Sequence, residues 1–248
     1  MIIFFDTETT DDVTKGRLIQ LGIKERGVEQ PVLNAMYAPP TPISFESMAV
    51  HHITPKIIGD RPLFKDAPEY IKTKALFEAS DTISVAHNAA FDIAILKKED
   101  IAVPKFICTM KVARALDPED KIPSYRLQYL RYFLGIEVEG INAHDAWGDV
   151  VVLEQLFERL LAKMVKEKGS EEDAIKEMIA ISLKPSLVRT IRFGKYAGKK
   201  LADILKEDRG YLEWLLKQKQ QNPDGDEDMV YSLEEYLGVP HQAAKLWD

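Results

Sequence analysis

The chain opens with short apolar runs separated by turn-forming polar residues, and later turns to longer stretches with apolar residues at helical spacing. The predicted strands are 1–5, 17–24, 31–37 and 82–86, and the predicted helices are 67–79, 89–98, 107–116, 124–134 and 146–168. The last helix is long and amphipathic, with one apolar side that comprises Leu153, Leu156, Phe157, Leu160 and Leu161. This order of elements predicts a mixed α/β domain that begins with antiparallel strands.

The character of the sequence changes near Lys184. A further helix is predicted over 170–183, and the stretch 184–200 then carries six basic residues and no acidic one. The segment from Asn222 to Glu235 is rich in Asp and Glu and predicts a solvated loop and a short helix, to which we assign no function. We therefore expect three parts. They are a core domain over 1–168, a helical linker over 169–183, and a C-terminal module over 184–248 with a basic start and an acidic tail.

Composition bounds the class of protein. With 248 residues, 46% hydrophobic and 29% charged, the chain has enough apolar material for a sizeable core. Its single cysteine, Cys108, cannot form an internal disulfide, and one thiol with five histidines does not make a zinc site of the usual spacing. The start MIIFFDTETT has no basic region and reaches an acid after five apolar residues, so we expect neither a signal peptide nor a membrane span. A cytoplasmic protein fits these features.

The formal net charge of -7 argues against a protein that coats nucleic acid non-specifically, because that binding depends on Lys and Arg neutralising phosphates. It does not exclude a nuclease. Carboxylates that hold metal ions count as negative in the sequence but are neutralised once the metals bind. Local charge therefore matters more than the total.

The first candidate site is Asp6-Thr7-Glu8, where the first strand ends. Residues two apart in a strand project from the same face, so the two carboxylates converge. Oxygen ligands of this kind suit Mg²⁺ or Mn²⁺. An isolated D-x-E motif is more often a strand end whose acids face water or cap a helix.

The second candidate site is the junction from Val85 to Asp92, where a strand passes into a helix. Asn88 is placed to cap that helix, and Asp92 would point from its first turn, where the helix dipole favours a carboxylate. Phe91 would pack against a base or enter the core, and for Phe91 alone the core is the commoner place.

The third candidate site is the segment from His144 to Asp149, with the histidine on a loop and the acid in the opening turns of the long helix. A neutral imidazole near pH 7 is suited to take a proton from water, and the acid is suited to hold a metal. Asp145 is an alternative helix cap. By itself H-x-x-x-x-D is a weak pattern.

The three motifs gain specificity from their combination and order: D-x-E after the first strand, H-N-x-x-F-D after a later strand, and H-x-x-x-x-D opening a helix. Over residues 1–165 they resemble the motifs of the DEDDh exonucleases, which include the proofreading subunit of bacterial replicative polymerase, ribonuclease T and oligoribonuclease. The resemblance implies a ribonuclease H-like fold, with a mixed five-stranded sheet flanked by helices. It matches His144 to the general base, and it matches four acids to the metal ligands, namely Asp6, Glu8, Asp92 and Asp149.

Four further stretches narrow the resemblance to the exonuclease X family. They are SMAVHHIT at 47–54, ICTMKVAR at 107–114, FGKYAGK at 193–199 and GYLEWL at 210–215. Members of that family carry a small C-terminal module after the nuclease domain, so the likeness covers nearly the whole chain and implies a DNA 3′–5′ exonuclease acting in repair. One departure concerns the grip on a duplex end. The family often has Gly and a hydrophobic residue after D-T-E-T, whereas here Thr10 is followed by Asp11 and Asp12.

The mechanism implied by the resemblance uses two divalent ions, Mg²⁺ or Mn²⁺, roughly 4 Å apart on the four acids. His144 would take the proton of the attacking water, and the products would be 5′-nucleotides. The substrate is expected to be the 3′ end of single-stranded or double-stranded DNA. The expected contacts with its terminal nucleotide are Thr7, Glu8, Thr9, His87, Asn88, Phe91 and His144.

The basic start of the C-terminal module has two interpretations of about equal weight. Its cations either bind phosphates of the strand or belong to a solvated hairpin. The residues concerned are Lys184, Arg189, Arg192, Lys195, Lys199 and Lys200. The glycine spacing from Gly194 to Gly198 is too short for a nucleotide-binding P-loop, and no ATP is expected.

Two alternatives to a DNA exonuclease stay open. An exoribonuclease of the same superfamily could use identical catalytic residues, because two-metal chemistry neither requires nor forbids a 2′-hydroxyl. A non-catalytic accessory of a polymerase could hold DNA ends with the same fold, although the intact acids and histidine argue against it. A homodimer, and contacts with repair or replication proteins, are compatible with the resemblance.

Overall fold

The computed structural model describes residues 1–138, 146–221 and 227–240, and the chain divides into two compact units. The N-terminal unit comprises Met1–Leu116 and Ser124–Ser182, and the C-terminal unit comprises Asp117–Pro123 and Leu183–Asp248. Each unit has a hydrophobic core of its own. Among the described residues, no helix is both long enough and apolar enough to cross a membrane.

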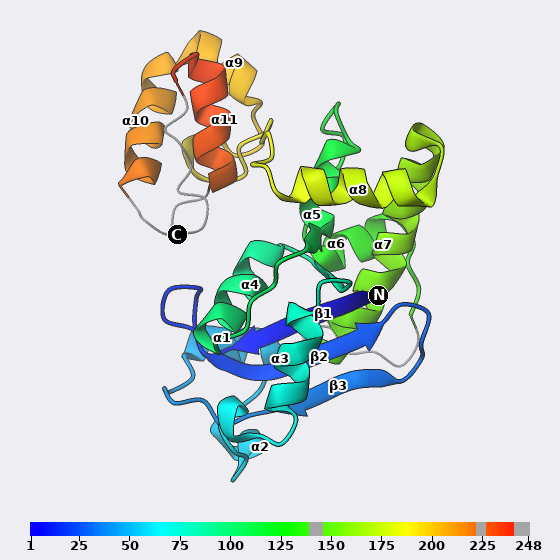
Figure 1. Cartoon of the computed structure of the whole chain (residues 1–248). Coiled ribbons are helices and arrows are strands. Elements are labelled where there is room, and N and C mark those ends of the chain that lie inside the picture. The colour runs from blue at the N-terminus through cyan, green and yellow to red at the C-terminus, as the bar shows by residue number, and fades with distance from the viewer. Residues whose placement is uncertain (139–145, 222–226, 241–248) are drawn as a thin grey trace. The chain divides into compact units, whose positions relative to one another are not determined.

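A five-stranded mixed sheet forms the centre of the N-terminal unit, with the strand order β3-β2-β1-β4-β5 (Figure 1). The strands are β1 (Ile2–Thr9), β2 (Leu18–Glu25), β3 (Pro31–Met36), β4 (Ile83–Ala86) and β5 (Phe106–Cys108). The first three strands pair antiparallel, whereas β1–β4 and β4–β5 are parallel. This arrangement confirms the expected mixed sheet, and it makes β1 the central strand, which is the usual place for a fully apolar run.

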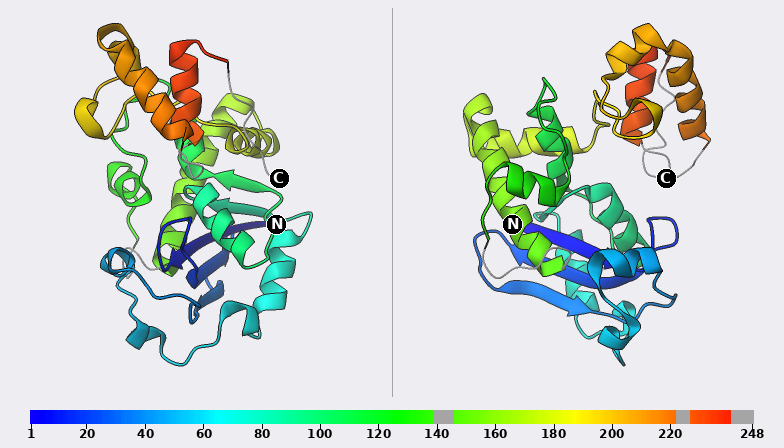
Figure 2. Two further views of the ribbon diagram at one scale, coloured as in Figure 1. Left: turned by 90° about the vertical axis from the view of Figure 1, so that its left-hand side faces the viewer. Right: turned by 180° about the vertical axis from the view of Figure 1, so that it is seen from behind.

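Helices cover both faces of the sheet, and the alternation of β1 decides which residues face which layer. On one face, Phe4 meets Phe157 of α7 (Ala146–Lys168) with the ring centroids 5.3 Å apart. On the other face, Phe5 meets Phe77 of α3 (Tyr70–Glu78) at 5.0 Å. Two further views show α7 and α4 (Ala89–Lys98) on opposite sides of the sheet (Figure 2). Even-numbered residues of β1 therefore face α7.

The remaining elements of this unit are helical. They are α1 (Phe45–His51), α2 (Pro55–Ile58), η1 (Phe64–Asp66), α5 (Thr109–Ala115), α6 (Leu127–Phe133) and α8 (Glu171–Ser182). The run 107–116, predicted as one helix, begins instead with the last residues of β5. Its first residues pair with β4, with Val85 opposite Ile107.

The segment expected as a helical linker is α8, which packs against β5, α5 and α7 within the N-terminal unit. Ser182, at its end, accepts a hydrogen bond from Cys108 N at 2.8 Å and donates to Met178 O at 2.7 Å. The change to the C-terminal unit follows at Leu183, next to the expected boundary at Lys184.

The C-terminal unit contains η2 (Gly194–Tyr196), α9 (Leu201–Glu207), α10 (Arg209–Gln220) and α11 (Glu227–Leu237). Its core includes Met229, Leu233 and Leu237, which lie four residues apart along α11. The acidic segment expected to be solvated thus buries an apolar stripe, because residues at this spacing share one side of a helix. Of its acids, Glu227 and Glu235 are exposed, whereas Asp228 and Glu234 are buried. Residues 222–226 of that segment lie outside the described residues.

Candidate active site

Two acids project from the end of β1 toward α7. Asp6 and Glu8 are partly exposed, while Thr7 between them is buried on the opposite face. They lie on the same face as Phe4, which contacts α7. Alternation along one strand therefore places both carboxylates beneath the N-terminal end of the long helix, as expected from the D-x-E motif.

The first turn of α7 lies unusually close to the sheet, and Gly22 makes this approach sterically feasible. Gly22 is the β2 partner of Asp6. A Cβ atom at Gly22 would lie 2.8 Å from Ala146 O and 2.9 Å from Ala146 C, which is closer than such contacts normally occur. Ala146 N donates to Gln20 Oε1 at 3.4 Å, and Gln20 is opposite Glu8. The strand beside the acids thus holds the start of α7.

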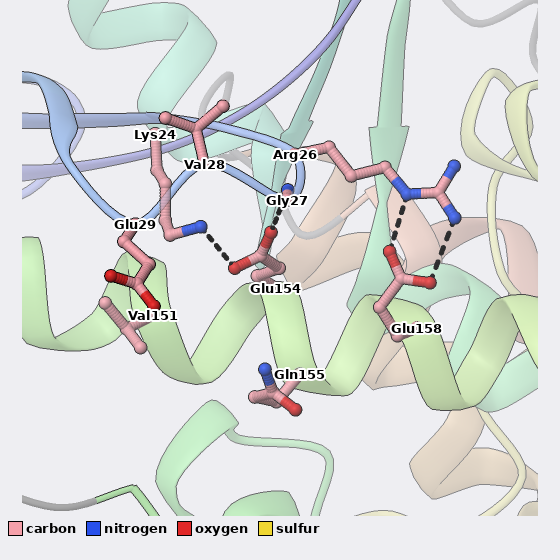
Figure 3. A pocket seen from close by; sticks show the side chains of 9 residues that line it. All are labelled: Lys24, Arg26, Gly27, Val28, Glu29, Val151, Glu154, Gln155 and Glu158. Atoms are coloured by element: carbon pink, nitrogen blue, oxygen red, sulfur yellow. Dashed lines mark hydrogen bonds and ion pairs between the residues drawn. The ribbon is translucent and has the colours of Figure 1, made fainter.

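Farther along α7, ion pairs fasten the helix to the end of β2 and the turn after it (Figure 3). Lys24 Nζ lies 2.5 Å from Glu154 Oε2, and Glu154 Oε1 accepts from Gly27 N at 2.8 Å. Arg26 donates to both oxygens of Glu158, at 2.6 and 3.0 Å. Lys24, Arg26, Glu154 and Glu158 line a pocket and are paired with each other, so we assign these groups a role in holding α7 rather than a ligand.

The result is a cluster of three carboxylates. One oxygen each of Asp6, Glu8 and Asp149 lies within 4.8 Å of the other two. Asp149 is in the first turn of α7 and is 9% exposed. Converging carboxylate oxygens are the ligands that hard divalent cations such as Mg²⁺ and Mn²⁺ prefer. The donor set therefore fits such an ion.

Asp92 lies next to this cluster but is turned toward β1. It is in the first turn of α4, is 3% exposed, and its Oδ1 accepts from Thr7 N at 3.1 Å and Thr7 Oγ1 at 2.7 Å. Burial raises the pKa of Asp92 to about 7; the bonds from Thr7 oppose this shift, and the negative charge of Asp149 adds to it. A divalent cation bound to the neighbouring acids would supply positive charge beside this buried carboxyl.

The fifth predicted catalytic residue, His144, lies outside the described residues, as does Asp145. Its role as a general base stays a prediction. In the sequence it precedes by two residues the first residue of α7, Ala146, and α7 is the helix that carries Asp149.

Comparison with known proteins identifies the family. Residues 3–157, more than half of the chain, match the family described as Exonuclease. The chain belongs to this family of DnaQ-like exonucleases. It is a 3′–5′ exonuclease, hence a nuclease hydrolase, and the DEDDh members of the family depend on divalent metals. Residues 191–220 also match the exodeoxyribonuclease X-like C-terminal family.

Among curated relatives of this exonuclease, exodeoxyribonuclease 10 of Escherichia coli (strain K12) is 31% identical over 220 residues, which cover 87% of this chain and 90% of the relative. DNA polymerase III subunit epsilon of Treponema pallidum (strain Nichols) is 29% identical over 195 residues, covering 71% and 85%. Among solved structures, exonuclease X in complex with 5′ overhanging duplex DNA superposes with a TM-score of 0.56 at 26% identity, covering 73% of this chain and 99% of that one. These matches place the exonuclease close to exonuclease X.

The junction between β4 and α4 differs from its expected geometry in one respect. Asn88 has a left-handed backbone, with φ 63° and ψ 45°, and its side chain makes no capping hydrogen bond. An N-cap side chain reaches the helix from an extended backbone, and the left-handed entry removes that route. Phe91 is partly buried and packs against the core, as its alternative interpretation holds.

His87 is engaged on both ring nitrogens in this exonuclease. Nδ1 lies 2.8 Å from Thr109 Oγ1, and Nε2 lies 2.7 Å from the carbonyl oxygen of Tyr125. Burial lowers the pKa of His87 to about 4, with the nearby Arg114 acting in the same direction. The ring is therefore neutral at pH 7, with Nε2–H donating to Tyr125, and it joins β4 to the chain before α6. Its expected contact with the terminal nucleotide remains untested.

Two residues near the acids were not singled out by sequence reasoning. Gln128 of α6 donates from Nε2 to Asp149 Oδ1 at 2.5 Å. His51, at the end of α1, accepts from Ile53 N at 2.9 Å through Nδ1, and its Nε2 lies 3.2 Å from Thr9 O. Neither residue belongs to a pattern that indicates metal chemistry. Gly22 did carry a signal, because a glycine inside a strand often marks a close backbone approach.

In the C-terminal unit, several of the expected DNA-contacting cations are paired with acids of the same unit. Lys195 lies 3.2 Å from Asp208, Arg192 lies 3.5 Å from Asp120, and Lys199 pairs with Glu207. Lys200 precedes α9, and Arg189 donates to Leu187 O at 3.4 Å. The local positive charge is thus smaller than the sequence of 184–200 suggests. Exposed pairs of this kind are weak and can exchange partners, so phosphate binding stays a prediction.

Proposed function

We propose that this exonuclease removes nucleotides one at a time from the 3′ ends of DNA, releases 5′-nucleotides, and serves in DNA repair. Support for DNA comes from exodeoxyribonuclease 10 of E. coli, whose name specifies that substrate. Exonuclease X, 26% identical to this chain, is bound to 5′ overhanging duplex DNA in its structure. The match of residues 191–220 to the C-terminal module of exodeoxyribonuclease X points the same way. A cytoplasmic location stays a prediction.

The observation that carries the proposal is the convergence of Asp6, Glu8 and Asp149 within 4.8 Å. With Asp92, these acids would hold two divalent ions, Mg²⁺ or Mn²⁺. When bound, such ions stabilise the charge that develops on a phosphoryl group and make water easier to deprotonate. The negative charge of Asp149 adds to the raised pKa that burial gives Asp92, which supports placing both acids at one site.

The side chains of the protein have separate tasks in the proposed reaction. His144 takes the proton from the attacking water, for which a neutral imidazole near pH 7 is suited. Thr7 fixes Asp92 through two hydrogen bonds, so the fourth acid is already oriented. Because Asp92 is already oriented, its side chain needs little rearrangement when the substrate binds.

Contacts with the terminal nucleotide are assigned first to the backbone at Thr7 and Glu8 and to the side chains of Asn88 and Phe91, by hydrogen bonding and stacking. Thr9, His87 and His144 are assigned as further contacts. The exposed side chain of Asn88 and the partly exposed ring of Phe91 are compatible with this role. Phosphates farther along the strand are assigned to Lys184, Arg189, Arg192, Lys195, Lys199 and Lys200.

The test is digestion of a 5′-labelled DNA strand beside the same sequence in RNA and a 3′-blocked DNA, with Mg²⁺, with Mn²⁺ and with chelator. Parallel reactions use Asp6→Ala and His144→Ala. The proposal expects a metal-dependent ladder that shortens from the free 3′ end of DNA and is lost in both variants. Trimming of RNA alone would show that the protein is an exoribonuclease and that the assignment of DNA as substrate is wrong. Binding of DNA without cleavage would instead indicate a non-catalytic accessory.

A further inference from the structure

Helix α6 connects the acidic cluster to the protein surface through a short chain of hydrogen bonds. Gln128 Nε2 donates to Asp149 Oδ1 at 2.5 Å. Arg131, one turn later on α6, donates from Nη1 to Gln128 Oε1 at 3.4 Å. An amide oxygen cannot donate, so the bond from Arg131 fixes the Gln128 amide with its NH₂ toward Asp149.

This contact has a consequence for metal binding. A carboxylate can turn about its side-chain bonds, and a donor that bonds to Oδ1 restricts that turning and so fixes how Asp149 faces a cation. The donor carries no net charge, so it adds no positive charge beside Asp149. A lysine or arginine in the same position would also hold the oxygen, but its positive charge would repel a divalent ion.

From this geometry we infer that Gln128 is a positioning residue for the metal site: it orients Asp149 through a neutral hydrogen bond without touching the metal itself. The inference rests on the proposed metal site and deepens it. Substitution of a group that orients a metal ligand typically lowers metal affinity or activity by about tenfold to a hundredfold.

The test measures binding of Mn²⁺ alone by calorimetry, so it does not depend on catalysis. Gln128→Met removes the donor but keeps an unbranched side chain. Gln155→Met is the matched control, since Gln155 is an exposed glutamine on α7, the helix that carries Asp149. We expect Gln128→Met to weaken Mn²⁺ binding by about tenfold or more and the control to leave it unchanged. Equal affinities in both variants would overturn the inference, even if Gln128→Met lowered the melting temperature.

A second substitution separates the effect of the hydrogen-bond donor from the effect of its charge. Gln128→Lys supplies a donor with a positive charge, and we expect it to weaken Mn²⁺ binding at least as much as Gln128→Met. Wild-type affinity in Gln128→Lys would contradict the requirement for a neutral donor. If Gln128→Met does not fold, Gln128→Asn, whose shorter side chain withdraws the amide, takes its place. If the wild-type protein binds Mn²⁺ but does not cleave DNA, the proposed function is overturned while the inference about Gln128 stands.

An independent observation concerns the outer side of the same helix. The rings of Tyr129 and Phe133 stack at 6.0 Å with an interplanar angle of 21°, and the two residues are 40% and 50% exposed. Tyr132 is 74% exposed, and the guanidinium of Arg131 lies 5.4 Å from its ring centroid. The buried residues Leu127 and Leu130 occupy the other side of α6. Three exposed aromatic rings on a seven-residue helix form a larger apolar surface than scattered single residues do.

The position of Gln128 on α6 relates this surface to the active site. Tyr132 is four residues after Gln128, so the two side chains are neighbours on one face of the helix. The aromatic arc of Tyr132, Tyr129 and Phe133 therefore starts beside the residue that contacts Asp149. Exposed aromatic faces suit the stacking of unpaired nucleobases. We propose that the aromatic arc stacks bases of a single-stranded segment that leads to the active site, an assignment that rests on the proposed function.

The test compares oligo-dT with an abasic strand of equal length, by fluorescence anisotropy in metal-free buffer. In wild type we expect tighter binding of oligo-dT. In Tyr129→Ala/Phe133→Ala and in Tyr132→Ala we expect oligo-dT to lose about tenfold while the abasic strand is unaffected. Ile71→Ala is the control, because Ile71 is a 72% exposed apolar residue on α3. An unchanged preference for oligo-dT in the variants, or a change only in oligomeric state by light scattering, would overturn the assignment. If wild type binds both strands equally, the proposed role of the aromatic arc is overturned. The proposed catalytic function would not be affected by that result.

Discussion

Lys24 and Glu154 form a buried ion pair, with Nζ and Oε2 2.5 Å apart and side chains only 6% and 9% exposed. Glu154 follows Asp149 by five positions along α7, so the pair fixes the helix about one and a half turns from the acidic cluster. Such a pair adds little over an apolar pair of the same shape, but the loss of one partner leaves an uncompensated buried charge.

We therefore predict that Lys24→Met lowers the free energy of unfolding by about 3–5 kcal/mol. The double variant Lys24→Met/Glu154→Gln should recover most of this loss, because it removes the second charge while the amide oxygen of the introduced side chain still accepts from Gly27 N. Urea denaturation of the wild type, both single variants and the double variant gives the coupling directly. Additive losses would show that the two charges do not interact.

Gly22 offers a second prediction, because its missing Cβ leaves room for α7. In Gly22→Ala the new atom would lie 2.8 Å from Ala146 O, so the first turn of α7 has to move away from the sheet. We expect a loss of about 1–3 kcal/mol in stability and a larger fractional loss in kcat, since Asp149 moves with the helix. Gly210→Ala is the control. Its Cβ would lie 3.8 Å from Asp208 Oδ1, an ordinary contact, and alanine favours a helix.

The depressed pKa of His87 predicts a stability that decreases as the pH is lowered. In the unfolded chain the histidine titrates near its ordinary pKa of 6.5, whereas in the folded protein the pKa is about 4. Below about pH 6.5 the unfolded state therefore binds a proton that the folded state does not, and the loss grows to at most about 3 kcal/mol near pH 4. Above pH 6.5 both states are neutral and His87 contributes no pH dependence.

The measurement for His87 is the free energy of unfolding in urea at several pH values between about 7 and 5, without metal. In His87→Gln the titration is removed, while an amide remains to donate to Tyr125 O. The difference in slope between wild type and variant isolates His87, because the raised pKa of Asp92 acts in the opposite direction in both proteins. Parallel curves for the two proteins would refute the prediction.

The buried stripe of α11 makes a fourth prediction. Leu233 is fully buried in the core of the C-terminal unit, so Leu233→Ala should destabilise that unit by about 2–5 kcal/mol. Limited proteolysis of the full chain is the measurement, with earlier cleavage expected within 183–248. Glu235→Ala changes an exposed residue of the same helix and serves as the control. Equal cleavage rates for the two variants would show that α11 does not support this core.

The sequence predicts elements best where periodicity and termini agree. The bounds of α4 and α7 match the predicted helices 89–98 and 146–168, because each has a sustained apolar face. The alternation of β1 likewise placed Asp6 and Glu8 on one face. In contrast, β5 has three residues, too few to show a period. Because helical residues follow it directly, its last residues were predicted as part of a helix.

The parts of the site that sequence could not predict depend on tertiary contacts. Nothing in the spacing of Gln128 indicates a bond to Asp149, since that bond requires α6 and α7 to pack together. The left-handed backbone of Asn88 also escapes prediction, because an asparagine before a helix fits both a cap and this conformation. In α11, acidic composition obscured an apolar stripe that periodicity alone would have shown.

The acids of the cluster are widely separated along the chain. Asp6 and Glu8 leave the ribosome early, whereas Asp149 belongs to a helix that follows the whole sheet. During synthesis, a growing chain has the strand that carries the first two acids long before it has the helix that completes the cluster. A partly synthesised chain thus lacks the complete cluster until α7 has docked on the finished sheet, so the proposed metal site forms only with the folded state.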